Sequence, residues 1–203
     1  MSLSQFQRLR RFVIAALIAA AFCALLFVHS VWDSETNAIH DLVEAVGLGF
    51  IVIGIIGRMW CTLYIGGRKA AEIVDLGPYS ITRNPLYVFS SVAALGVGAQ
   101  TGSVILAAVF FLGCVAAFQF VIRREEEHLT DAFGAPYVAY TQRVPRFWPK
   151  WSLYRDQAFL NVDTGRLYQT FRDGMVFFVA KPAFELVEQL QSMDLLPVVL
   201  RLY

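Results

Sequence analysis

Charge and cysteine are both scarce in this chain of 203 residues, and each shortage excludes a class of protein. Only 16% of the residues are charged, and the 17 basic and 16 acidic side chains leave a net charge of +1. No run of basic residues forms a nucleic-acid face, so we expect no nucleic-acid partner. The 3 cysteines lie inside apolar runs, without the spacing of a disulfide framework or a zinc site. The sequence alone therefore predicts no metal site.

Hydrophobic residues are abundant instead. They make up 57% of the chain, with 17 Phe, a composition typical of membrane proteins. A helix needs about 20 apolar residues to cross a bilayer core about 30 Å thick. Four candidate spans follow, at residues 12–32, 42–65, 86–99 and 103–122. Because no small-x-small cleavage site follows the first span before an acidic loop, an uncleaved anchor is favoured over a signal peptide.

The last two spans are joined by Gln-Thr-Gly and are expected to form a helical hairpin, although residues 86–99 are short for a crossing. The predicted fold is an all-α integral-membrane bundle of four to five transmembrane helices, with a membrane domain at residues 1–151 and an extension at residues 152–203. In the extension, residues 156–170 look loop-like. Residues 175–200 are apolar but interrupted by charges and Pro182, which favours an amphipathic interfacial helix over a broken final span.

Basic residues predict the orientation of the bundle. They flank the first span, follow the second, and follow the hairpin, whereas the loop at residues 33–41 has three acids and neither Lys nor Arg. By the positive-inside rule, the N-terminus and the two polar segments after residues 65 and 122 are expected in the cytoplasm. Oligomeric state is not indicated.

The first polar segment contains the sequence GPYSITRNPLY at residues 77–87. Asn84 is expected to cap a helix whose first residue is Pro85. The need to start a helix explains Asn84 and Pro85. It does not explain Tyr79, Arg83 and Tyr87. They gather a cation and two hydroxyl groups at a helix N-terminus, which favours an anion such as a carboxylate.

Two further clusters follow the hairpin. REEEHL, at residues 124–129, is either a solvated helix end or a functional group of acids. Because the hairpin returns its ends to one side of the membrane, we expect Glu125 and Glu126 near Arg83 and Tyr87. FGAPYVAYTQRVPRFWP, at residues 133–149, is either an aromatic belt at the membrane surface or a lid over a site. In the lid, three side chains would turn inward: Tyr137, Tyr140 and Arg146.

The order of these motifs, with LGVG between the first two, resembles the integral-membrane methyltransferases of the isoprenylcysteine carboxyl methyltransferase and phospholipid methyltransferase type. Their pattern is approximately GPYxxxRHPxY, GxG, EExxL and FGxxYxxYxxxVPRFxP, and the resemblance covers about residues 42–151. Asn84 stands where that pattern usually has histidine, so a titratable imidazole is missing there. The matching positions are Arg83, Pro85, Tyr87, Gly96, Gly98, Glu125, Glu126 and Leu129.

The resemblance implies methyl transfer from S-adenosylmethionine, with S-adenosylhomocysteine as product, to a lipid, lipidated or other hydrophobic acceptor. Arg83 would face the cofactor carboxylate, Glu125 or Glu126 its ammonium or ribose, and Tyr87 or Tyr137 its adenine. Gly96 and Gly98 would allow close approach of the cofactor or merely of a second helix. The implied catalytic set is Arg83, Asn84, Glu125 and Glu126. Tyr140 joins the cofactor site, and the implied substrate or lid residues are Arg146, Phe147 and Trp148.

The acceptor decides whether a base is needed. A carboxylate acceptor is already nucleophilic, whereas an amine must first lose a proton, and the candidates for removing it are Glu125, Glu126, Glu127 and His128. Two other classes stay open. An NADPH-dependent membrane reductase of the sterol or steroid type would need a nicotinamide site, and a non-catalytic membrane scaffold would need none.

Overall fold

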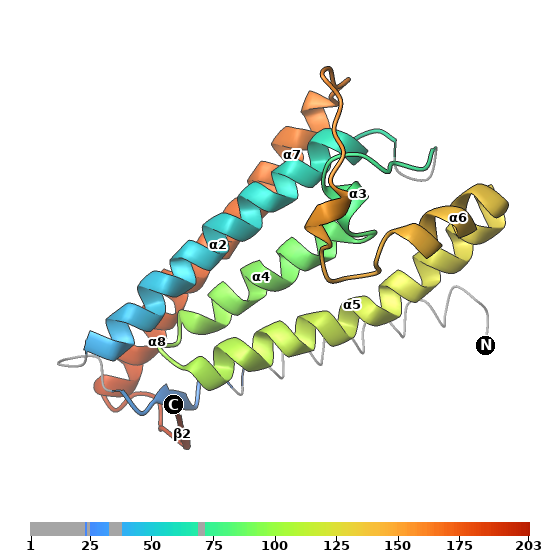
Figure 1. Ribbon diagram of the computed structural model, residues 1–203. Coiled ribbons are helices and arrows are strands. Elements are labelled where there is room, and N and C mark those ends of the chain that lie inside the picture. Colours follow the sequence, from blue (N-terminus) through green and yellow to red (C-terminus); the bar gives the residue numbers. More distant parts are fainter. Residues whose placement is uncertain (1–22, 24, 33–37, 69–71) are drawn as a thin grey trace, which may run out of the picture.

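The computed structural model describes residues 23, 25–32, 38–68 and 72–203, and this part of the chain is mostly helical (Figure 1). Its centre is formed by three helices: α2 (Ala38–Ile65), α4 (Pro85–Ala99) and α5 (Val104–Phe133). Helix α4 packs against both α2 and α5. Three short elements lie near one end of this group: α3 (Pro78–Ile81), α6 (Ala135–Arg143) and the 3₁₀ helix η1 (Trp151–Leu153). The predicted hairpin is confirmed as α4 and α5.

Small residues let α2 and α4 approach each other closely. A Cβ atom added to Gly54 would lie 2.6 Å from the Cβ of Ala93, and one added to Gly47 would lie 2.7 Å from the Cβ of Ala99. Contacts between small residues are typical of helices packed inside membranes, where dispersion replaces the hydrophobic effect. The hairpin turn is held by Ser103, whose side chain caps α5 by accepting a hydrogen bond from the Leu106 amide.

Two helices in the described part of the chain, α2 and α5, are long and apolar enough to cross a membrane. Helix α4 has only 15 residues, or about 22 Å at 1.5 Å per residue, which is shorter than a bilayer core. The expected first span, residues 12–32, falls largely outside the described residues. The predicted count of four to five spans therefore stays a prediction.

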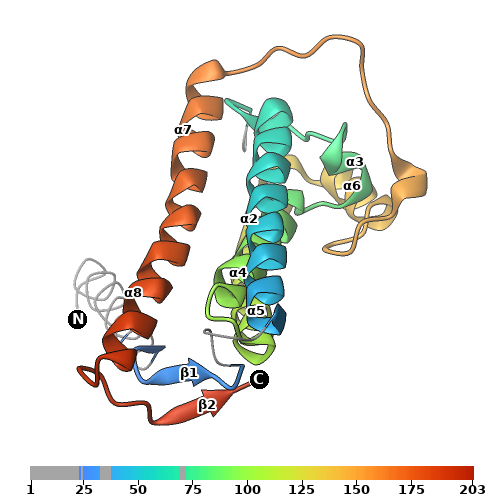
Figure 2. The same cartoon turned by 90° about the vertical axis from the view of Figure 1, so that its left-hand side faces the viewer.

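The C-terminal extension is more helical than the sequence indicates. Helices α7 (Thr164–Met175), η2 (Val176–Val179) and α8 (Ala180–Ser192) follow one another along α2, running antiparallel to it (Figures 1 and 2). The hydroxyl groups of Thr62 and Thr170 lie 3.0 Å apart, and Lys181 Nζ lies 2.7 Å from Glu44 Oε2. The loop expected through residue 170 is thus wrong from Thr164 onward, because polar residues of this segment find partners on α2.

Two short strands also depart from the all-α prediction. Strand β1 (Val28–Ser30) pairs in parallel with β2 (Leu200–Leu202), with Val28 opposite Leu200 and Ser30 opposite Leu202. The carbonyl of Tyr203 accepts hydrogen bonds from the Ile105 amide and the Ser103 hydroxyl. The C-terminus is therefore held against the start of α5, at the end of the bundle opposite α3 and α6 (Figure 2).

Candidate functional site

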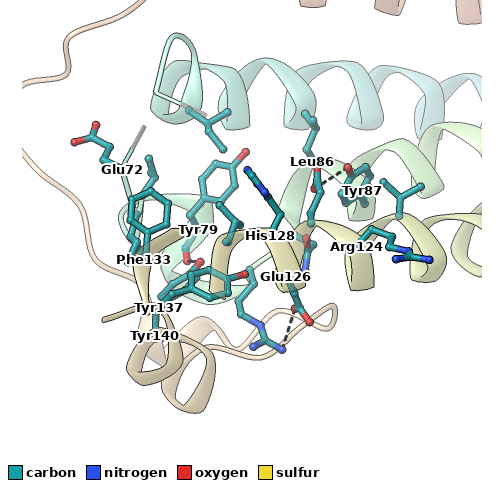
Figure 3. Close-up of a pocket in the computed structure, with 18 residues that line it drawn as sticks. Glu72, Tyr79, Leu86, Tyr87, Arg124, Glu126, His128, Phe133, Tyr137 and Tyr140 are labelled. Carbon is teal, nitrogen blue, oxygen red and sulfur yellow. Dashed lines mark hydrogen bonds and ion pairs between the residues drawn. The ribbon is translucent and has the colours of Figure 1, made fainter. Parts of the chain in front are cut away.

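A cavity of about 360 Å³ lies between α4, α5, α6 and the loop after α2 (Figure 3). This volume lies within the range typical of small-molecule sites. Aliphatic and aromatic side chains form much of its wall: Ile65, Ile73, Val74, Leu86, Val121, Leu129 and Phe133. Its polar and tyrosine side chains come from all three sequence clusters: Tyr79, Arg83, Asn84, Tyr87, Arg124, Glu125, Glu126, His128, Tyr137 and Tyr140, together with Glu72.

Residues 77–87 form part of the cavity wall, and their glycine and prolines determine the course of the backbone there. Gly77 has a φ of +55°, a left-handed conformation that favours glycine, and its Cα faces the Tyr64 ring. Pro85 is the first residue of α4, as predicted, and Asn84 occupies the cap position. The Asn84 side chain does not cap the helix, however. Its Nδ2 donates to the Arg146 carbonyl at 2.9 Å, because the later motif runs alongside.

The last motif docks onto this loop mainly through the backbone. The Arg83 amide donates to the Pro145 carbonyl at 2.9 Å, and the Lys150 amide donates to the Ile81 carbonyl at 2.9 Å. The buried Thr82 hydroxyl donates to the Phe147 carbonyl at 2.9 Å. Two motifs that are more than fifty residues apart in sequence are therefore joined by hydrogen bonds beside the cavity.

Glu126 lies between two arginines. Its Oε1 is 3.3 Å from Arg83 Nη2 and its Oε2 is 2.6 Å from Arg146 Nη2. The side chains of Glu126 and Arg83 are only 12% and 11% exposed. Arg83 also donates to the Thr141 carbonyl, and its buried Nε has no hydrogen-bond partner within the described part of the chain. Arg83 thus lines the cavity with its charge already paired to Glu126, and one of its buried donors has no partner among the described residues.

Glu125 completes the predicted convergence of the acids with the start of α4. The Tyr87 hydroxyl donates to Glu125 Oε2 at 2.9 Å. The acids do not sit at a helix end, because α5 continues as a helix to Phe133 and presents them from its side. Glu127 lies on an exposed face and pairs with Arg124 at 3.6 Å, so the three acids separate into two cavity residues and one surface residue.

Tyr137 and Tyr140 are buried and line the cavity, as the lid hypothesis requires. The Tyr140 hydroxyl donates to the Tyr79 carbonyl at 2.8 Å. Burial, with the nearby Glu126 carboxylate, raises the pKa of Tyr137 to about 12. Its hydroxyl therefore stays protonated at neutral pH and can act as a hydrogen-bond donor.

Other residues singled out in the sequence lie away from the cavity wall. Gly96 meets Gly47 and Ile51 of α2, and Gly98 meets Ala107 of α5. Helix packing accounts for both glycines. Pro85 and Phe147 are buried as supports, Arg146 reaches the site only through Glu126, and Trp148 is 70% exposed. No motif signalled the aliphatic wall, because Ile65, Ile73 and Val74 come from ordinary apolar sequence.

The chain matches a known protein family over part of its length and is similar to two named proteins. Residues 43–136 match the phospholipid methyltransferase family. The chain is 36% identical over 160 residues to the nickel-cobalt-cadmium resistance protein NccN of Alcaligenes xylosoxydans xylosoxydans, across 79% of this chain and 74% of that protein. It is equally similar to the cobalt-zinc-cadmium resistance protein CzcN of Cupriavidus metallidurans, across 79% and 73%. No solved structure gives a significant match.

Proposed function

The chain belongs to the phospholipid methyltransferase family, and from this premise we propose that it transfers a methyl group from S-adenosylmethionine to a hydrophobic acceptor at the cytoplasmic membrane face. The observation that carries the proposal is the convergence of Arg83, Tyr87, Glu125 and Glu126 on one largely apolar cavity. The basic residues of the neighbouring loops support the cytoplasmic assignment.

The lining chemistry fits the proposed cofactor. S-adenosylmethionine carries a sulfonium, an ammonium and a carboxylate, and each charge must be matched near lipid. Glu125 and Glu126 supply negative charge, and the guanidinium of Arg83, which lines the cavity, supplies positive charge. Tyr79, Phe133 and Tyr137 offer aromatic surface for an adenine ring. In this account Tyr87 fixes the orientation of Glu125, and Arg146 fixes that of Glu126.

The bound cofactor supplies an activated methyl group, and the protein supplies alignment and exclusion of water. Aliphatic residues on the cavity wall would receive the apolar part of the acceptor. Val121 and Leu129 belong to α5, and many of the large apolar side chains of this helix are exposed, including Val109, Leu112 and Phe120. This exposure supports entry of a lipid, or of a lipidated molecule, sideways from the bilayer.

Amine acceptors would need a base within the cavity. Glu125, Glu126 and His128 line it, whereas Glu127 faces the surface, so the candidates narrow from four residues to three. Asn84 cannot take up a proton near neutral pH, and its amide holds the Arg146 carbonyl instead. We therefore assign Asn84 a positioning role in this site.

Binding of S-adenosylhomocysteine to the purified full chain tests the proposal. We expect saturable binding to the wild type and to Glu127→Gln, and at least a tenfold weaker affinity for Glu125→Gln and Glu126→Gln. Glu127 is the matched control because it is the adjacent acid on the same helix. NADPH is titrated in parallel. Binding of NADPH without binding of S-adenosylhomocysteine would replace this proposal with the reductase hypothesis, which the family match does not support.

We further propose that the methyl transfer contributes to resistance against divalent metal cations. Both relatives are named as resistance proteins for cobalt, cadmium and either nickel or zinc. Expression of the chain in a metal-sensitive bacterium should raise the tolerated Co²⁺ or Cd²⁺ concentration, and Glu126→Gln should abolish the increase. Equal growth of cells with and without the chain would refute this role and leave the methyl-transfer proposal intact.

A further inference from the structure

A second polar cluster lies at the other end of the bundle. His40 and Glu44 stand one turn apart at the start of α2, and Glu188 reaches them from α8. His40 Nε2 is 3.5 Å from Glu44 Oε1 and 3.6 Å from Glu188 Oε1. Along α2, His40 is roughly 37 Å from Ile65 of the methyltransferase cavity, at 1.5 Å per residue. The two sites are therefore separate.

The imidazole of His40 is fixed in one orientation. Its Nδ1 lies 3.1 Å from the Trp32 carbonyl, which can only accept a hydrogen bond. Nδ1 therefore carries a proton, and in the neutral ring the lone pair of Nε2 points towards the two carboxylates. A second hydrogen bond that orients the ring in this way is typical of histidines that bind metal ions.

The side chains of the cluster are largely shielded from solvent. The His40 side chain is 3% exposed, Glu44 is 11% exposed and Glu188 is 18% exposed. Gly102, in the turn between α4 and α5, has a φ of +65° and lies against the imidazole so closely that a Cβ would collide with it. Elements from both ends of the chain and from its middle thus enclose the cluster.

Charge is unbalanced in this enclosure. Lys181 Nζ binds Glu44 Oε2 at 2.7 Å, which leaves Glu44 Oε1 and the Glu188 carboxylate facing the imidazole of His40. With the imidazole neutral and both carboxyl groups ionised, two acids and one ammonium leave one negative charge in excess, and a buried charge needs a partner. A cation between the three ligand atoms would supply it.

We propose that His40, Glu44 and Glu188 bind a divalent transition-metal ion. The three ligand atoms all lie within 4.8 Å of one another. A zinc ion about 2.1 Å from each of three tetrahedral ligands holds those atoms about 3.4 Å apart, close to the 3.5 and 3.6 Å already present. Lys181 would not contact the ion. It would hold Glu44 Oε2, the carboxylate oxygen that does not bind the metal.

The ligand set indicates which ions fit. One imidazole and two carboxylates suit Zn²⁺, Co²⁺ or Ni²⁺, whereas Cu⁺ prefers sulfur ligands and Ca²⁺ six to eight oxygens. Three protein ligands leave at least one coordination position for water or an exchanging ligand. Glu188 is the most exposed ligand, so it marks the side from which an ion would enter.

Titration with Co²⁺ tests this site, because bound Co²⁺ changes its visible absorption with coordination. The full chain is purified in detergent, stripped with a chelator and titrated, and Zn²⁺ binding is measured by equilibrium dialysis. We expect one ion per chain in the wild type and at least a tenfold weaker affinity in Glu188→Gln and Glu44→Gln. The matched control is Glu185→Gln, on the same helix, whose exposed carboxylate pairs with Lys181 at 3.0 Å outside the cluster. It should bind like the wild type.

Two results would overturn the proposal. One is the absence of saturable binding to the wild type, which would mean that the cluster holds together without a metal ion. The other is equal Co²⁺ affinity in wild type, Glu188→Gln and Glu44→Gln. Since neither measurement involves methyl transfer or its cofactor, failure of this proposal leaves the proposed function untouched, and the reverse also holds.

Discussion

Replacing Glu126 by glutamine perturbs the centre of the candidate site without changing its shape. In the wild type the carboxylate bridges Arg83 and Arg146, at 3.3 and 2.6 Å. Glutamine keeps one acceptor oxygen but removes the charge, so Arg83, only 11% exposed, is left without an anionic partner. Arg83 Nε already has no hydrogen-bond partner among the described residues, so the substitution leaves the buried guanidinium still less well paired.

The loss of stability in Glu126→Gln can be estimated from how deeply the ion pair is buried. Breaking a fully buried ion pair costs about 3–5 kcal/mol. Arg146 is 42% exposed and can turn to water, and the glutamine still accepts one hydrogen bond, so we expect about 2–3 kcal/mol for Glu126→Gln. For a chain of this size each kcal/mol shifts the thermal midpoint by about 2–4 °C. The predicted decrease is therefore about 4–12 °C.

Thermal unfolding of the detergent-purified protein measures this shift, and Glu127→Gln is its control. Glu127 and Arg124 are 66% and 72% exposed and lie 3.6 Å apart, a surface pair that contributes about 0.2–1 kcal/mol. We expect the control to unfold within about 2 °C of the wild type. If both variants unfold together with the wild type, Glu126 is a surface residue in solution and the described ion pairs do not hold the site.

Three further substitutions test other parts of the account. Tyr87→Phe removes the hydroxyl that orients Glu125 and should weaken S-adenosylhomocysteine binding by about tenfold, which corresponds to about 1.4 kcal/mol; unchanged affinity in a calorimetric titration would exclude this contact. Asn84→His should keep the wild-type thermal midpoint, since imidazole can donate to the same carbonyl, whereas Asn84→Asp should lower it. Gly54→Ala should destabilise the α2–α4 contact by about 1–3 kcal/mol. Gly49→Ala, which meets no atom within 4 Å, should instead stabilise α2 by up to about 1 kcal/mol, and equal midpoints would contradict the packing.

The central helices could be predicted from the sequence, because their apolar runs and helix-start residues are local features. The apolar runs predicted α2, α4 and α5 to within a few residues at most ends, and Asn84-Pro85 predicted the start of α4. The end of α5 was missed by eleven residues, because the acidic cluster after Ile122 is polar yet helical. Its helix continues to Phe133, where Gly134 with a φ of +61° ends it.

Long-range partners could not be read from the sequence. Thr164 to Met175 is polar and contains Gly174, so it resembles a loop until α2 supplies Thr62 and Ile55 as partners. A strand of three residues is too short to leave a recognisable pattern in the sequence. The partner of β1 is β2, which lies far from it along the chain. For the same reason the sequence does not predict that His40, Glu44 and Glu188 lie together. His40 and Glu44 stand at helical spacing, but Glu188 lies 148 residues from His40.

The candidate site was predicted in outline because a hairpin returns its ends to one place. That geometry brought Glu125 to Tyr87 and Glu126 to Arg83, as expected. The sequence does not predict which of the three acids line the cavity and which one faces solvent. Adjacent residues on a helix point in different directions, and only packing decides which face is buried. The aliphatic wall of the cavity depends on the fold alone.

Transfer of a labelled methyl group from S-adenosylmethionine tests the central claim most directly. The purified full chain is incubated with the labelled donor and a bacterial membrane lipid extract, and the organic phase is separated and counted. We predict that the wild type labels an extractable hydrophobic product and that Glu126→Gln does so at least a hundredfold more slowly. Labelling by the wild type no greater than that by Glu126→Gln, with both proteins folded, would contradict the account.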